Sequence, residues 1–460
     1  MEPMPLTAGN YELMESDDRL TLQVWTEERN FVRRIVAIEA EHAGRVDLTV
    51  ERFGRRTGIA QLLDVAKPAG EKMTRKSTRL TFREAFRRML SRQFPRYRLV
   101  DLSSDLDLQH SLSGACTRAY LRLGGSAYAA VGAATASEAE GVLTAGLIWL
   151  DHLRRRESGT AIEGLALFVP AGAERTVCHR VRHLRPDLVT FSVFTVRDGW
   201  EQPVDITDAG NIETQLVDRT RLLGMPRWLN VVAAAPGVEL IECGEGVSLR
   251  VNGLEFARCA GGQVYFGIAS RHRARESSVG EMLALASELV RMRSGGSRSQ
   301  LGLAAPERWL ESVIRRNLPD IDAGLLPAPV YGQAPTIASG ERGVIDLLAI
   351  GIDGRLTVVE VKASEDLNLP VQALDYWARV KWHLDSGDFA RSGYFSGMPL
   401  STKPPRMLLV APALHFHPTS ETILRFFPPE LEVERIGVGS SWRTELKVVF
   451  RARGAEPVCL

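Results

Sequence analysis

Three charged residues near the C-terminal end of the chain interrupt two apolar stretches that are rich in β-branched residues. Asp346 lies within residues 343–350, and Glu360 and Lys362 lie within residues 356–363. A carboxylate pair that faces one ammonium on apolar strands costs several kcal/mol of desolvation unless an ion or a partner compensates it. These residue types suit metal-assisted hydrolysis, in which carboxylates hold an oxygen-preferring cation and an ammonium stabilises developing negative charge.

A β-hairpin is the element expected to position these residues. Between the two stretches, Asp353-Gly354 supplies the positive φ angles that a tight turn needs. Side chains alternate between the faces of a strand, so Glu360 and Lys362 share one face and the valines beside them pack into the other. Asp346 on the partner strand can reach the charged face. The alternative is a surface hairpin with a cross-strand ion pair, worth under about 1 kcal/mol.

The Asp…Glu-x-Lys pattern resembles that of the PD-(D/E)XK nuclease superfamily, with Asp346, Glu360 and Lys362 at the motif positions. Ile345 stands where the name of the superfamily has proline, a substitution that its members commonly show. Lysine is scarce in this arginine-rich chain, so a lysine inside an apolar strand indicates that a compact point charge is required there.

A second feature follows on the next expected helix, which runs from Pro370 to Leu384. Gln372 and Tyr376 are four residues apart and share one helical face, as in the Gln-x-x-x-Tyr of the RecB-like and NucS-like branches. Arg379 continues that stripe. The resemblance implies that these three residues contact the DNA backbone near the scissile phosphate, and it covers roughly residues 306–452.

The resemblance also implies a cofactor, Mg²⁺ or Mn²⁺, held by Asp346, Glu360 and the carbonyl of Val361. In the superfamily a glutamate from the first helix commonly completes the metal shell. Helix 307–318 offers Glu307 and Glu311 one turn apart, and Glu311 is preferred because it lies deeper in the helix. Lys362 would orient the attacking water, help to deprotonate it and stabilise the pentacovalent transition state.

The composition sets limits on the rest of the protein. With 460 residues, 45% apolar and 25% charged, the chain resembles an ordinary globular protein of two to four domains. It contains no apolar run of eighteen residues and no signal pattern, so we expect a cytoplasmic protein without a membrane partner. Five widely spaced cysteines are expected to be reduced core residues. A net charge of +1 means that any surface for nucleic acid must be local.

The most basic segment, residues 72–98, is the candidate for such a local surface. Thr81 and Glu84 form a capping box that predicts the start of a helix, whose buried stripe would be Phe82, Phe86, Met89 and Leu90. The other face carries the residues predicted to bind nucleic acid: Arg83, Arg87, Arg88 and Arg92. A solvated helix face is the alternative.

The fold class expected is mixed α/β, with a C-terminal restriction-endonuclease-like domain whose mixed sheet is flanked by helices. The predicted divisions are a β-rich unit (1–70), an α/β domain (71–200), a β-rich subdomain with a helix (201–293), a linker (294–305) and the nuclease-like domain (306–455).

The element order of residues 71–200 parallels that of the C-terminal domain, and we hypothesise a degenerate copy of the nuclease-like unit. Aligning residues 358–362 with residues 128–132 puts Ala130 and Gly132 at the positions of Glu360 and Lys362, so this copy would be inactive. Independent packing of an ordinary α/β domain would produce a similar order.

These observations predict a metal-dependent nuclease that hydrolyses DNA in repair or defence. The alternative is a non-catalytic nucleic-acid-binding or regulatory protein that keeps the fold. The expected partner is DNA, with a homodimer as one option for the assembly. His415 and His417 form a His-x-His pair whose place in a loop before Pro418 favours a structural role over a zinc site.

Overall fold

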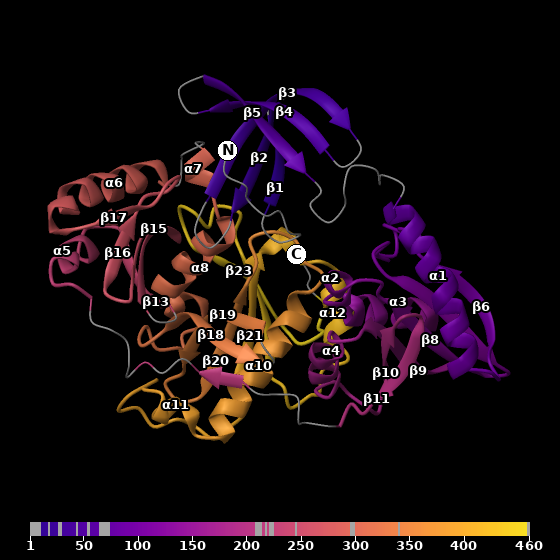
Figure 1. Cartoon of the computed structure of the whole chain (residues 1–460). Helices are drawn as coiled ribbons and strands as arrows, with labels where there is room; N and C mark the ends of the chain where they lie inside the picture. The colour runs from indigo at the N-terminus through magenta and orange to yellow at the C-terminus, as the bar shows by residue number, and fades with distance from the viewer. Residues whose placement is uncertain are drawn as a thin grey trace.

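The computed structural model describes residues 11–16, 19–25, 30–42, 45–52, 56–63, 74–207, 214–216, 219, 225–243, 246–294, 300–338 and 341–457. Helices and strands alternate along most of this length, and the strands form four sheets that are mixed or antiparallel (Figure 1). The predicted mixed α/β class is confirmed. No helix among the described residues is long and apolar enough to cross a membrane.

The N-terminal sheet is an antiparallel meander whose five strands pair in chain order. Leu22, Leu48 and Val50 are buried in it. Its strands are β1 (Tyr11–Ser16), β2 (Arg19–Trp25), β3 (Asn30–His42), β4 (Arg45–Arg52) and β5 (Arg56–Leu63).

The next region, called unit 1 below, is a sheet of six strands between two helical layers. Its elements are α1 (Thr74–Gln93), β6 (Arg98–Ser103), β7 (Thr117–Leu123), β8 (Ser126–Gly132), α2 (Ala136–Ala139), α3 (Val142–Arg156), β9 (Ala161–Pro170), α4 (Glu174–Val181), β10 (Thr190–Arg197) and β11 (Trp200–Val204). Helix α1 covers one face through Phe86, Met89 and Leu90, which are buried as predicted. Helices α3 and α4 cover the other face.

Helix α1 begins at Thr74, so Thr81 lies inside the helix and the predicted capping box is wrong. No glycine or proline interrupts residues 74–81, and the arginines and lysine there are good helix formers. A capping pair marks a helix start only where the preceding residues leave the helical conformation.

A β-rich subdomain follows, built from α5 (Leu229–Ala233), β13 (Val238–Cys243), β14 (Gly246–Val251), β15 (Leu254–Ala260), β16 (Gln263–Phe266), β17 (His272–Ala274), η2 (Glu276–Ser278) and α6 (Val279–Met292). The predicted Asn252-Gly253 turn is present, with φ angles of 45° and 78°. Two strands that were not predicted from the sequence lie within the range assigned to this subdomain but pair elsewhere: β11 is the edge of the unit 1 sheet, and β12 (Thr214–Leu216) pairs with the C-terminal sheet. Short edge strands carry little sequence signal because one neighbour and a few backbone hydrogen bonds define them. The predicted linker contains a short helix, α7 (Gln300–Leu303).

The C-terminal region, called unit 2 below, comprises α8 (Pro306–Arg316), α9 (Leu318–Ile321), β18 (Tyr331–Ala338), β19 (Glu341–Ile350), β20 (Leu356–Val361), α10 (Leu369–Asp385), α11 (Asp388–Arg391), β21 (Arg406–Pro412), η3 (Ala413–His415), α12 (Thr419–Leu424), β22 (Val433–Val438) and β23 (Val448–Arg453). Its sheet has the order β12-β18-β19-β20-β21-β22-β23. Helix α8 packs on one face through Leu310 and Ile314, and α10 and α12 pack on the other.

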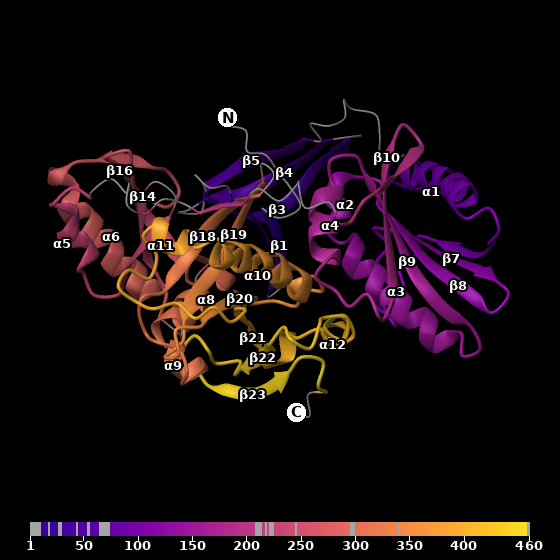
Figure 2. The same cartoon turned by 90° about the horizontal axis from the view of Figure 1, so that it is seen from below.

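Units 1 and 2 have the same topology. In each, three strands pair antiparallel in sequence, the third to fifth pair parallel through helical crossovers, and the sixth is antiparallel. Helix α3 corresponds to α10, and α4 corresponds to α12. Across the boundary α3 packs against α12 and α4 against α10, so that both units share one hydrophobic core (Figures 1 and 2).

Candidate active site

Strands β19 and β20 form the predicted hairpin, with Leu347 opposite Val359 and Gly354 in the turn at a φ of 77°. Val359 and Val361 are buried in the core beneath α8. Glu360 points to the opposite face and is 2% exposed. A carboxylate therefore lies buried at the end of an apolar strand, as the sequence predicts.

Asp346 adjoins the same strand end. The backbone N–H of Val361 donates a hydrogen bond to Asp346 Oδ2 over 2.9 Å. Continuing the register past Leu347 and Val359 places Asp346 opposite Glu360. The hairpin thus brings both predicted carboxylates and the main chain of Val361 to one place.

Lys362 follows immediately after β20 and contacts carboxylates on two elements. Its Nζ lies 3.0 Å from Oε1 of Glu307 on α8 and 3.5 Å from Oε1 of Glu360. Asp366 lies 4.0 Å away. The ammonium therefore joins the first helix of unit 2 to the hairpin.

Glu307 contacts the lysine, whereas the prediction preferred Glu311 as a metal ligand. Glu311 is buried beside Arg250 and Arg315, and burial raises its pKa despite these arginines. No group of three or more carboxylate, imidazole or thiolate side chains that could hold a metal ion occurs among the described residues. The charge of Glu311 nevertheless contributes more than that of Glu307 to the raised pKa of Asp346, so Glu311 lies near that carboxylate, and its part in holding a metal ion stays a prediction.

Contacts of α8 explain that position. Ser312 and Arg315 donate hydrogen bonds to Glu239 on β13, and the Arg315 distance is 2.6 Å. Gly332 allows Glu311 to approach β18, because a Cβ there would lie 3.1 Å from Oε1 of Glu311. The side of α8 that carries Ser312 and Arg315 is therefore anchored to the subdomain, and Glu307 in its first turn contacts Lys362.

The protonation equilibria at the site reflect crowded negative charge. Burial, reinforced by the carboxylates of Glu311 and Glu307, raises the pKa of Asp346 to about 8. Burial and the neighbouring Asp346 raise the pKa of Glu360 well above its usual range. Burial lowers the pKa of Lys362, but Glu360, Glu307 and Asp346 outweigh it and raise that pKa above its ordinary value. Lys362 is consequently an ammonium at neutral pH.

Helix α10 brings Tyr376 close to the carboxylates. Burial, together with the charges of Glu360 and Asp346, raises the pKa of Tyr376, which therefore lies beside them. Gln372 lies one turn earlier, and its buried Oε1 receives no hydrogen bond from the described residues. Arg379 is 5% exposed and donates to Asp375 Oδ2 over 2.8 Å, beside His179 of unit 1. The prediction that Arg379 contacts DNA is wrong for this structure, because tertiary packing of α10 against α4 covers that part of the helix.

The site fits a hard divalent cation. Glu360 Oε2 is buried and receives no hydrogen bond from any described residue, although a buried carboxylate oxygen normally has a partner. Asp346 and the main chain of Val361 adjoin it, and oxygen donors of this kind are preferred by Mg²⁺ and Mn²⁺.

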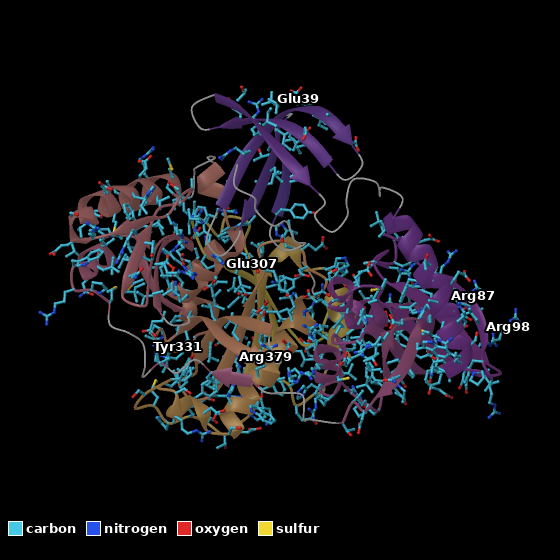
Figure 3. The ribbon with its side chains drawn as sticks, in the orientation of Figure 1. Glu39, Arg87, Arg98, Glu307, Tyr331 and Arg379 are labelled. Carbon is cyan, nitrogen blue, oxygen red and sulfur yellow. The ribbon has the colours of Figure 1, made fainter. Side chains whose placement is uncertain are left out.

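The arginines of α1 lie far from this site. Figure 3 shows Glu307 near the middle of the molecule and Arg87 and Arg98 at the outer end of unit 1. Arg87 and Arg88 are exposed, whereas Arg83 is half-buried. Arg92 donates from Nε to Oε1 of the buried Glu201 over 3.0 Å, and its guanidinium stacks 4.6 Å from the ring centre of Trp200. Arg92 therefore has a structural ion pair, while Arg87 and Arg88 face solvent.

The other sequence candidates have structural contacts. His415 Nδ1 is hydrogen-bonded to the carbonyl of Ala363 over 2.8 Å, and His417 Nδ1 to the hydroxyl of Thr419 over 2.7 Å. The cysteines whose side chains are described, Cys116, Cys178 and Cys259, are buried and form no disulfide. Cys459 lies outside the described residues.

Unit 1 differs from unit 2 at the corresponding place. Gly132 pairs with Phe168, whose carbonyl accepts from Ala133 N–H, just as Val361 pairs with Val410, whose carbonyl accepts from Lys362 N–H. Val131 and Ala133 therefore correspond to Glu360 and Lys362, one residue later than the sequence alignment placed them. The faces agree, because Ala130 packs beneath α1 as Val359 packs beneath α8.

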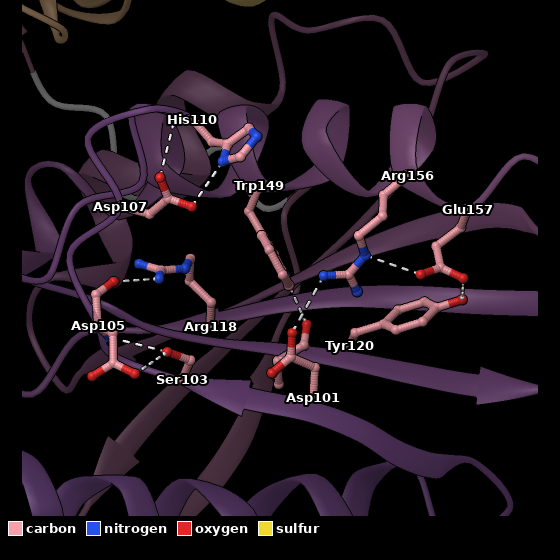
Figure 4. Close-up of polar contacts among 11 residues, drawn as sticks. Asp101, Ser103, Asp105, Asp107, His110, Arg118, Tyr120, Trp149, Arg156 and Glu157 are labelled. Carbon is pink, nitrogen blue, oxygen red and sulfur yellow. Dashed lines mark hydrogen bonds and ion pairs between the residues drawn. The ribbon is translucent and has the colours of Figure 1, made fainter.

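The residue opposite Val131 is Arg118, which therefore occupies the place of Asp346. Its guanidinium donates to the backbone carbonyls of Asp105 and Ser113, with 2.6 Å to Asp105, and so fastens the loop before β7. Figure 4 shows Arg118 turned to Asp105, with Trp149 between it and Arg156. An alignment by strand pattern missed this shift, since two consecutive apolar runs without charges fit either register.

Comparisons with known proteins give no further guide to the site. No protein-family model matches the chain, and no curated protein matches it.

Proposed function

We propose that unit 2 is a metal-dependent nuclease that hydrolyses phosphodiester bonds of DNA. The observation that carries this proposal is the buried Oε2 of Glu360, which has no hydrogen-bond partner among the described residues and adjoins Asp346 and Lys362. A structural ion pair would use such an oxygen, whereas a cation site keeps it available. The superfamily resemblance of residues 306–452 supports the same reading, and we place the activity in the cytoplasm.

Asp346, Glu360 and the carbonyl of Val361 would hold Mg²⁺ or Mn²⁺. The bound ion would neutralise charge on the phosphodiester and lower the pKa of a water molecule. Val361 N–H fixes Asp346, since the 2.9 Å hydrogen bond to Oδ2 leaves the other carboxylate oxygen available to a cation. The apolar strand around Glu360 excludes bulk water and so strengthens each electrostatic interaction at the site.

Lys362 is suited to stabilise negative charge rather than to abstract a proton. Its raised pKa keeps the amine protonated, and an ammonium cannot accept a proton from water. Positioned between Glu307 and Glu360, it can donate hydrogen bonds to a water and to the phosphoryl oxygens as negative charge develops. Tyr376, beside the carboxylates, supplies a hydroxyl that can bind the DNA backbone.

The test is incubation of the full chain with supercoiled plasmid, linear duplex and single-stranded DNA in Mg²⁺, Mn²⁺ or EDTA. We expect cleavage with either metal and none with EDTA. DNA binding without cleavage under every metal condition would instead favour the alternative, a nucleic-acid-binding protein that keeps the nuclease fold. The exposed Arg87 and Arg88 on α1 are the observation that supports such binding.

A further inference from the structure

The contacts between units 1 and 2 are those of a twofold dimer. In an isologous pair, if one element contacts a second across the axis, the second contacts the first on the other side. Helix α3 packs on α12 and helix α4 packs on α10, and these pairs exchange when the corresponding helices of the units are interchanged. One chain thus contains both halves of a symmetric assembly.

The position of the pseudo-twofold axis follows from residues that meet their own counterparts. Gly141 caps the N-terminus of α3, and Asn368 caps the N-terminus of the corresponding α10. A Cβ on Gly141 would lie 3.8 Å from Oδ1 of Asn368, so these equivalent residues are in contact. Only positions at an axis meet their equivalents in this way. The axis therefore passes between the starts of α3 and α10.

The catalytic position of unit 2 and its equivalent in unit 1 are each joined to the residues at the axis by a short segment of chain. Lys362 precedes Asn368 by a short loop, and Ala133 precedes Gly141 by another that contains α2. The C-terminal ends of the equivalent strands β20 and β8 are consequently expected on the same side of the molecule, on either side of the axis. Duplex DNA is itself pseudo-twofold in its backbones, so a duplex centred on the axis offers one strand to each unit.

Only one of these two positions keeps the residues for hydrolysis. Unit 2 has Asp346 with Glu360 and Lys362, a set with an excess of negative charge that suits a cation. Unit 1 has Arg118 with Val131 and Ala133, a set with a positive charge and no carboxylate. Arg118 is 3% exposed and its guanidinium donates hydrogen bonds to backbone carbonyls, so no carboxylate stands at the positions of Asp346 and Glu360, and removing the arginine from these contacts would be costly.

We propose that the chain acts as a single-chain pseudo-dimer that nicks duplex DNA, cutting the strand at unit 2 while unit 1 holds the opposite strand uncut. The inference rests on the proposed nuclease function. In the reaction the water oxygen bonds to phosphorus, one P–O ester bond breaks, and the departing oxygen receives the proton that the water loses. No equivalent reaction takes place at unit 1, so one binding event yields one nick.

The test follows supercoiled plasmid in Mg²⁺ with the full chain at limiting concentration. Open circles should be the first product, with linear DNA formed only later from independent nicks. Linear DNA formed together with open circles from the start would overturn the inference while leaving the nuclease function intact. Absence of cleavage on every substrate would overturn both.

Two further measurements do not depend on product analysis. Sedimentation of the Asp346→Asn variant on a short duplex in Ca²⁺ should give one chain per duplex, and two chains per duplex would overturn the pseudo-dimer. The parent should bind Mn²⁺ in calorimetry, and Asp346→Asn should remove that binding. Mn²⁺ that stays bound to Asp346→Asn but is lost on Asp107→Asn, in the loop that Arg118 fastens, would locate a second centre in unit 1 and contradict the proposal.

Discussion

Units 1 and 2 have sheets of the same topology but carry different side chains at the equivalent strand ends. At equivalent strand positions unit 1 has the buried Val131, which packs in an apolar core, and unit 2 has the buried Glu360, one oxygen of which accepts no hydrogen bond from the described part of the chain. The fold therefore forms without these charges, as unit 1 demonstrates. The buried carboxylates of unit 2 add desolvation and repulsion to a core that would pack without them, and the proposed cation would offset this cost.

The basic residues of the two units differ in the same way. The planar guanidinium of Arg118 donates hydrogen bonds to two backbone carbonyls and so holds a loop in place. This role requires several donors in a fixed geometry. Lys362 places a compact charge between Glu307 and Glu360. The arginine has a structural role and the lysine supplies a compact charge. Substituting Arg118 should therefore lower stability, whereas substituting Lys362 should lower activity.

The strongest way to break the comparison is to remove a carboxylate from unit 2. We predict that Asp346→Ala or Glu360→Ala abolishes metal-dependent cleavage, because each removes a cation ligand. The matched control in unit 1, Val131→Ala, should lower stability but keep activity per folded molecule. Cleavage retained by both carboxylate variants would contradict the assignment of the site.

The same variants should be slightly more heat-stable than the parent in EDTA, because repulsion between the carboxylates is relieved. The pKa of Asp346 is raised to about 8, so between its unfolded pKa, about 4, and that value the folded state holds more protons than the unfolded state. Metal-free stability of the parent should therefore fall as pH rises through this window. Thermal unfolding against pH should show a weaker fall for Asp346→Ala.

A sharper comparison concerns the type of basic residue. We predict that Lys362→Arg binds DNA and Mg²⁺ nearly as well as the parent but cleaves about 100-fold more slowly, or worse, the low end of the contribution of a positioned acid or base. The bulkier guanidinium should displace the water beside the carboxylates. Single-turnover cleavage and equilibrium binding at saturating Mg²⁺ measure this, with Lys381→Arg on the outer side of α10 as the control. Near-parental cleavage would make Lys362 an ion-pair partner only.

A smaller effect is expected at the boundary that joins the two units. Burial lowers the pKa of His179 and of His183 to about 4, although Asp375 opposes the shift. A histidine whose folded pKa is below its unfolded value binds protons more readily when unfolded, so stability is lost as pH falls from about 6.5 to 4. Each histidine contributes up to about 3 kcal/mol at full titration. Chemical denaturation across this range should show a loss that His179→Gln reduces and the exposed-site control His272→Gln does not.

The smallest effect separates the arginines of α1. If Arg87 and Arg88 contact phosphates, changing both to Gln should reduce the slope of log affinity against log salt by up to about 0.9 for each lost contact. Arg92→Gln should instead lower stability, because it leaves the buried Glu201 without its guanidinium. An unchanged slope in the double variant would make this face of α1 a solvated surface. The half-buried Arg83 is expected to follow Arg92 more than Arg87.

Local pattern was sufficient for the parts of this protein that depend on neighbours in sequence. The turn at Gly354, the alternation that separates Glu360 from Val359 and Val361, and the stripe of Phe86, Met89 and Leu90 on α1 follow from strand and helix periodicity. The order of helices and strands along the chain also indicated that the two units share a topology. Each of these features is decided within one element or between consecutive elements.

Packing between distant segments decided the remainder. Arg379 is turned into the boundary with unit 1 because α10 has a second helix layer, α4, against it, and no pattern within α10 reveals that layer. Glu307 contacts Lys362, and Glu311 lies near Asp346 as well as Arg250 and Arg315, because contacts of α8 with Glu239 of the subdomain fix how the helix is rotated. The place of Arg118 opposite Val131 depends on a strand register that two apolar runs leave open. Sequence therefore determined which residues could form a site, and tertiary contacts determined which of them face it, since helix rotation and strand register are set by partners far away in the chain.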